Sequence, residues 1–98
     1  MEIVRPVAIV IKETDNVATA ISELMAGERV KVRVGGEERE VELKNDIRFL
    51  HKFAVEDIEK GQHVRKYGES IGEATSRIQR GEHVHTHNLR SLRGCSSG

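Results

Sequence analysis

An eight-residue pattern occurs twice in the second half of the chain, and it restricts the fold more than any other feature. Residues 57–64 read Asp-Ile-Glu-Lys-Gly-Gln-His-Val, and residues 77–84, twenty positions later, read Arg-Ile-Gln-Arg-Gly-Glu-His-Val. Residues 26–30 form a fainter third copy. A glycine after a basic residue is typical of a turn with positive φ that leads into a strand. The copies therefore predict equivalent corners of one β-structure, and they are too few for a solenoid.

The sequence outside the repeat predicts further strands. Residues 3–11 are apolar and β-branched, which indicates a buried strand, and Pro6 places it at an edge or a bulge. Residues 30–34 and 37–43 alternate apolar with charged side chains on either side of Gly35-Gly36. That arrangement is the pattern of a β-hairpin whose charged face lies in solvent.

One segment has the spacing of a helix. Apolar residues in 16–25 recur at helical intervals after the capping residues Thr14-Asp15-Asn16, and Gly27 follows where a helix would end. We therefore expect one short amphipathic helix over residues 16–25. The fold class predicted from the whole pattern is mainly β with that single helix.

The length and charge of the chain limit its domain count and its partners. The 98 residues fit one domain, which we assign to residues 1–90, followed by a flexible tail at residues 91–98. Sixteen basic residues balance sixteen acidic ones and aromatic residues are few, which excludes the usual nucleic-acid binder. No apolar run approaches the ~20 residues that span a membrane, and the early acidic residue and short apolar stretch at residues 1–6 lead us to expect no signal peptide. The single cysteine fits a reducing compartment, so we expect a cytoplasmic protein.

The strongest chemical signal is the run His83-Val84-His85-Thr86-His87-Asn88. In a strand the three imidazoles would share one face at intervals of about 7 Å, so two of them converge on one ion more readily than three. The functional interpretation is a site for a divalent metal or for an anionic, hydroxylated substrate. The alternative is an exposed polar strand face, because His-x-His is common without a metal.

Other polar residues have both structural and functional interpretations. His63 occupies the repeat position equivalent to His83, which favours a structural role in the turn. His51 is expected to be half-buried, with a role in substrate binding as the less favoured alternative. Tyr67 either packs its ring with the hydroxyl at the surface or donates a hydrogen bond to a ligand. Asn88 either caps a turn or binds substrate.

Four motifs in order resemble a known family. They are His51-Lys52-Phe53-Ala54, then Asp57-Ile58-x-Lys60-Gly61, then Lys-Tyr-Gly-Glu-x-Ile-Gly-x-Ala at residues 66–74, then Gly-Glu-His-Val-His-Thr-His-Asn-Leu at residues 81–89. They resemble the N-terminal domain of altronate and galactarate dehydratases. That domain is of the SAF type, related to antifreeze proteins and to the C-terminal domain of sialic acid synthases. The resemblance covers nearly the whole chain and implies a β-clip fold, a long and sharply bent β-ribbon.

The resemblance also implies a function. It implies a small subunit or accessory domain of a lyase that dehydrates a sugar-acid substrate, with Fe²⁺ or Mn²⁺ held mainly by a partner. Because the chain stops at Gly98, we expect a separate large catalytic subunit and no activity of this chain alone. At the shared site we expect His85 and His87 as catalytic groups and metal ligands. We expect His83, Asn88 and Tyr67 to contact the substrate.

Several alternatives remain open. The chain is also similar to the small subunit of sulfolactate sulfo-lyase, which removes sulfite instead of water. A non-catalytic module that binds sugar acids or carbohydrates would bind its ligand without a metal. A small cupin-like metal enzyme ranks last, because no Glu and no further His follow His87 at the required spacing. The hairpin and the repeated corners are compatible with a homodimer or homotrimer.

Overall fold

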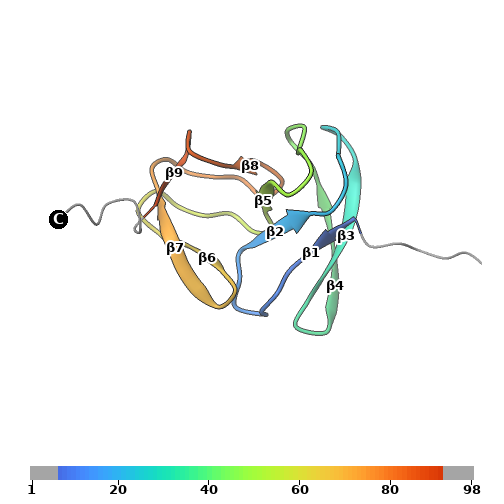
Figure 1. The fold of residues 1–98 in the computed structure, drawn as a ribbon, viewed down its shortest axis with the longest axis horizontal. Coiled ribbons are helices and arrows are strands. Elements are labelled where there is room, and N and C mark those ends of the chain that lie inside the picture. Colours follow the sequence, from blue (N-terminus) through green and yellow to red (C-terminus); the bar gives the residue numbers. More distant parts are fainter. Residues whose placement is uncertain (1–6, 92–98) are drawn as a thin grey trace, which may run out of the picture.

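The computed structural model describes residues 7–91, and every regular element in that range is a strand (Figure 1). The strands form three antiparallel sheets with the orders β1-β2-β5-β8, β3-β4 and β6-β7-β9. The mainly β fold class is therefore confirmed. The strands are β1 Ala8–Ile9, β2 Val17–Ala20, β3 Arg29–Val34, β4 Glu37–Glu42, β5 Lys52–Ala54, β6 His63–Lys66, β7 Glu69–Ala74, β8 His83–Val84 and β9 Leu89–Ser91.

Two predictions fall partly outside the described residues. The first half of the strand predicted at residues 3–11, with Pro6, lies outside them, and within its described part, residues 7–11, Ala8–Ile9 form strand β1. Residues 92–98 of the predicted tail also lie outside them, whereas Ser91 is the last residue of β9. No helix capable of crossing a bilayer occurs among residues 7–91.

The four-stranded sheet lies between the two ribbons (Figure 1). The β3–β4 hairpin is at one end of the molecule and the β6–β7 ribbon is at the other. Each end has its own apolar cluster. Phe53 of β5 belongs to the cluster that contains the valines of the hairpin, and its neighbour Ala54 belongs to the cluster around Ile58 and Ile78. Successive residues of one strand point to opposite faces, so β5 contributes to both clusters.

The helix predicted over residues 16–25 is wrong, because that segment contains strand β2. Strand β2 lies between β1 and β5, with the pairs Ala8↔Ala20 and Val17↔Ala54. All four of its residues are buried, since both of its faces are covered. The apolar spacing that suggested a helix comes from this two-sided burial and from Leu24, which forms a bridge to Ile47.

The predicted hairpin is confirmed. Strands β3 and β4 pair from Arg29↔Glu42 to Val34↔Glu37, and the valines of β3 are buried while its charged residues are exposed. The connecting residues Gly35 and Gly36 have φ values of 58° and 85°. Two consecutive positive φ values define the hairpin turn that glycine pairs favour.

Four corners share one backbone pattern, and they occupy residues 24–28, 47–51, 58–62 and 78–82. In each, the N–H of the fifth residue donates a hydrogen bond to the carbonyl of the second. The first residues pair across the molecule, Leu24 with Ile47 and Ile58 with Ile78. The fourth residue always has a positive φ, at Gly27 (90°), Leu50 (70°), Gly61 (89°) and Gly81 (94°).

The predicted equivalence of the repeat copies is confirmed by these corners. The fourth corner, residues 47–51, was not recognised in the sequence because Leu50 replaces the glycine that marks the other three.

Candidate functional site

Three histidines from distant parts of the chain meet at one place. We call His51, His83 and His85 the histidine cluster; each has a ring nitrogen within 4.8 Å of those of the other two. The Nδ1 atom of His51 is 2.9 Å from the Nε2 atom of His83, which is a hydrogen-bond distance. The rings are stacked, with centroid separations from 4.8 to 5.5 Å. Among the described residues this is the group whose geometry suits a metal ion.

Strand pairing brings the histidine cluster together. His51 ends the corner 47–51 and precedes β5, and β5 pairs with β8 through Lys52↔Val84 and Phe53↔His83. In antiparallel pairing the start of one strand lies beside the end of the other. His51 therefore lies beside the residues around the end of β8, His83 and His85.

The chain turns after β8, so the histidines do not form the flat row expected from an extended strand. Strand β8 contains only His83–Val84. The buried side chain of Asn88 closes the turn: its Oδ1 accepts a hydrogen bond from the His85 N–H at 3.0 Å, and its Nδ2 donates to the His83 carbonyl at 2.9 Å. The His83 N–H donates to Asn45 Oδ1 at 2.9 Å. These contacts fix the backbone that carries His83 and His85.

The other predicted site residues lie around the histidine cluster or elsewhere. His87 is exposed, and its ring is tilted against that of His83 at 5.4 Å, outside the group of three. Tyr67 lies in the turn between β6 and β7, with φ 58° and Lys66 Nζ 4.8 Å from its ring centroid. His63 is exposed and its Nδ1 is 2.6 Å from Ser70 Oγ. The roles given to His87, Tyr67 and Asn88 stay predictions.

His51 is the member of the cluster that the His-x-His pattern could not reveal. It is 32 residues from His83 in the sequence. Two signals pointed towards it: its place in the first family motif, and its place at the end of the five-residue corner 47–51, which begins with an apolar residue as the other corners do. The second signal was hidden because the glycine of that corner is replaced by Leu50.

Burial and mutual repulsion lower the pKa of two histidines of the cluster, His83 and His85. Partial burial, followed by the charge of His51, lowers the pKa of His83 from 6.5 to about 4. Desolvation and then the charge of His51 also lower the pKa of His85. Burial, followed by the charge of Lys66, lowers the pKa of Lys52, the residue next to His51. At neutral pH His83 is therefore a neutral imidazole, the form that ligates metals.

The donor set fits a divalent transition metal. Imidazole nitrogens bind at roughly 2.0–2.1 Å from zinc, and two ligands of one ion are then at most about 4 Å apart. Small side-chain rotations would bring the ring nitrogens, which are up to 4.8 Å apart, to this separation. A set of three imidazoles leaves coordination positions for ligands from elsewhere.

Comparison with known proteins places this chain in a family. The family described as altronate/galactarate dehydratase SAF domain matches residues 6–92. The chain belongs to this family. Altronate dehydratase of Escherichia coli (strain K12) is 46% identical over 77 residues, which are 79% of this chain and 15% of that protein. Altronate dehydratase of Bacillus subtilis (strain 168) is 36% identical over 81 residues, 83% of this chain and 16% of that protein.

The chain is also similar to proteins that are named for a different activity. The alpha subunit of (2R)-sulfolactate sulfo-lyase of Chromohalobacter salexigens is 40% identical over 52 residues, 53% of this chain and 55% of that subunit. The match thus spans about a sixth of the length of the two altronate dehydratases and about half of this alpha subunit.

Proposed function

We propose that this SAF domain is the small subunit or accessory domain of a sugar-acid dehydratase of the altronate/galactarate type. It contributes the histidine cluster to a site that it shares with a larger catalytic unit. The observation that carries the proposal is the convergence of His51, His83 and His85 in a domain of this family. The altronate dehydratases are six to seven times longer than the matched region, which is consistent with a larger unit that holds the rest of the site.

The cluster residues would hold Fe²⁺ or Mn²⁺ together with ligands from the larger unit. When bound, such an ion supplies Lewis-acid polarisation of a hydroxyl or carboxylate oxygen. The lowered pKa of His83 favours a role as ligand or hydrogen-bond acceptor, because a group with a pKa of about 4 holds no proton to donate at neutral pH. The exposed His87, beside His83, is placed to contact substrate or to carry a proton.

Charge around the cluster suits an acidic substrate. Lys52 follows His51 directly, and its positive charge acts on both His83 and His85. No carboxylate belongs to the three-residue group among the described residues. A sugar-acid carboxylate would therefore be attracted here, while the base that removes the proton next to that carboxylate would come from the larger unit.

The surface beside the cluster has the features of a contact site for a larger partner. Phe49 and Leu50, at the tip of the corner that ends in His51, are 55% and 61% exposed. Adjacent large apolar side chains in water are typical of a protein interface. The occupant that we assign to this tip is the larger catalytic unit, because docking there would enclose the histidine cluster on that side.

A second candidate function is the small subunit of a sulfolactate sulfo-lyase. It is favoured by the relatives named subunit alpha, of which this chain matches 55% and 75% of the length. Both candidates place the chain beside a larger catalytic subunit, and both suit the cytoplasmic location that we propose from the single cysteine. They differ in the substrate and in the leaving group.

The test is turnover of altronate, galactarate and sulfolactate by this chain with Fe²⁺ or Mn²⁺, with and without a larger catalytic unit of the dehydratase or sulfo-lyase type. We expect turnover only with both, and the substrate used decides between the two candidates. The variants His51→Gln and His85→Gln should lower turnover and lower the affinity of the pure chain for Mn²⁺ by about 100-fold, since each removes one of three ligands. His87→Ala should lower turnover and leave Mn²⁺ affinity nearly unchanged.

The matched control is His63→Gln, which changes the repeat-equivalent of His83 at an exposed position outside the cluster. It should leave both turnover and Mn²⁺ affinity unchanged. Turnover by this chain alone would overturn the proposal. Sugar-acid binding without turnover in any combination would favour a binding module.

A further inference from the structure

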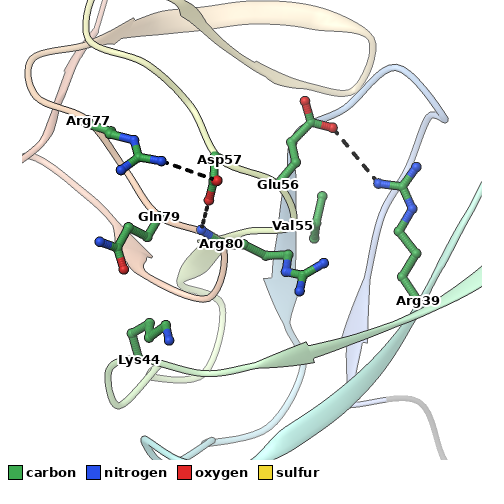
Figure 2. A pocket seen from close by; sticks show the side chains of 8 residues that line it. All are labelled: Arg39, Lys44, Val55, Glu56, Asp57, Arg77, Gln79 and Arg80. Atoms are coloured by element: carbon green, nitrogen blue, oxygen red, sulfur yellow. Dashed lines mark hydrogen bonds and ion pairs between the residues drawn. The ribbon is translucent and has the colours of Figure 1, made fainter.

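A cleft lies between the hairpin and the corner 78–82, and its residues have no role in the proposed function. Its volume is about 510 Å³, within the range of about 300–1,000 Å³ that is usual for small-molecule sites. Four cationic side chains and two carboxylates contribute to its wall. The lining residues are Arg39, Lys44, Val55, Glu56, Asp57, Arg77, Gln79 and Arg80 (Figure 2).

Both carboxylates of the cleft are already engaged. Glu56 forms an ion pair with Arg39 at 4.0 Å. Asp57 pairs with Arg77 at 3.4 Å and accepts a hydrogen bond from the backbone N–H of Arg80 at 2.9 Å. The dashed lines in Figure 2 mark these contacts. The acids of the wall are therefore not available to neutralise its other two cations.

Those two cations are Lys44 and Arg80. Among residues 7–91, no carboxylate lies within ion-pair distance of either side chain. Figure 2 shows the Arg80 guanidinium extending toward the side of the cleft formed by Val55 and Arg39. A guanidinium and an ammonium on one concave surface, without acidic partners, favour an anion that carries two negative charges.

The cleft is connected to the histidine cluster by short backbone paths. The Lys44 N–H donates to the Gly81 carbonyl at 2.9 Å, and the next residue, Asn45, accepts the hydrogen bond from the His83 N–H. Arg80 is three residues before His83 on the other path. An anion held by Lys44 and Arg80 would thus join the two segments that together position His83.

We propose that this cleft is a binding site for a small organic or inorganic dianion, held by the side chains of Lys44 and Arg80. The ligand chemistry is two negative charges on a compact molecule, which a dicarboxylate and a phosphate both provide. The site is separate from the histidine cluster, and its occupant acts on His83 through the two backbone segments. Binding in so open a cleft is weak, with a dissociation constant of about a millimolar at low ionic strength.

The test uses the ¹⁵N-labelled, metal-free chain and follows backbone amide signals during titration with succinate, inorganic phosphate or the neutral polyol galactitol. We expect saturable shifts of the Lys44 and Arg80 amides with one or both anions and none with galactitol, and a smaller shift of the His83 amide. Lys44→Gln and Arg80→Gln should each raise the dissociation constant about tenfold. The two anions distinguish a carboxylate ligand from a phosphate ligand.

Lys60→Gln is the matched control, because Lys60 occupies the place in the corner 58–62 that Arg80 occupies in the corner 78–82, and it does not line the cleft. It should bind the anions as the unmodified chain does. The proposal is overturned if neither anion gives saturable shifts. It is equally overturned if Lys60→Gln weakens binding as much as Arg80→Gln, or if the shifts centre on the histidine cluster and survive both cleft substitutions.

Discussion

The corners 47–51 and 78–82 build the same backbone turn from different residues, and each leads to a histidine of the cluster. In the corner 78–82 the position with positive φ is Gly81, and a Cβ atom there would clash with the Glu42 carbonyl oxygen. In the corner 47–51 the same position is Leu50, whose φ is 70° and whose side chain is 61% exposed. One corner is packed against a neighbouring strand, and the other projects into solvent.

The difference shows that glycine is required at such a corner for two separate reasons. The first is the left-handed conformation, which costs a residue with a Cβ roughly 1–2 kcal/mol. The second is close approach of another backbone, which excludes any side chain. Only the first reason applies at the exposed tip, so a larger residue is tolerated there. Leu50 adopts the left-handed conformation, with its energetic cost, at the tip where we propose that a partner docks.

The largest effect is expected from Gly81→Ala. The substitution adds a Cβ at a φ of 94° and against the Glu42 carbonyl, so it should reduce the free energy of unfolding by about 3 kcal/mol. Gly61→Ala is the matched control, because Gly61 has a φ of 89° and open space around its missing Cβ. It should cost about 1 kcal/mol. Urea unfolding of both variants separates the cost of the left-handed conformation from the cost of close backbone approach. An equal loss of unfolding free energy in the two variants would contradict the role of close approach.

A smaller effect is expected from the protonation of His83. Its pKa is lowered from 6.5 to about 4 in the folded chain, so the unfolded chain takes up this proton first as pH falls. The contribution of neutral His83 to the free energy of unfolding is complete above pH 6.5 and is lost as the pH falls toward 4. After allowance for solvent screening we expect a loss of about 1–2 kcal/mol.

Urea unfolding of the metal-free chain at several pH values measures this loss. In His83→Gln the decline in the free energy of unfolding between pH 6.5 and pH 4 should be less steep, because the proton uptake of His83 is removed. An unchanged slope would show that His83 keeps an ordinary pKa in the folded chain.

The smallest effect is expected from Leu50→Gly, which gives the corner 47–51 the residue of the other three. Glycine adopts the left-handed conformation without the steric strain that leucine has there. The strain removed should exceed the entropy cost of glycine, so the isolated chain should be stabilised by about 0.5 kcal/mol. The same variant should bind the larger catalytic unit less tightly, because an exposed apolar side chain is lost. Thermal unfolding and a binding assay separate the two effects, and a destabilised isolated chain would contradict the comparison.

Short-range patterns in the sequence were sufficient for much of the fold and part of the site. The alternating residues on either side of Gly35-Gly36 predicted the hairpin, and the repeat predicted that the corners 58–62 and 78–82 are equivalent. The run from His83 to Asn88 predicted a histidine-rich site, and two of its histidines, His83 and His85, belong to the cluster. These features succeed because side-chain alternation and glycine turns are properties of neighbouring residues.

The tertiary structure decided the features that depend on contacts between distant segments. Residues 17–20 form a strand because the segment pairs with β1 along one edge and with β5 along the other, although its local spacing matched a helix. His51 joins His83 because β5 pairs with β8, and His83 and His85 come together because Asn88 bends the chain after a two-residue strand. The residue types were visible in the sequence, but their separation in space is set by strand pairing across more than thirty positions of the chain.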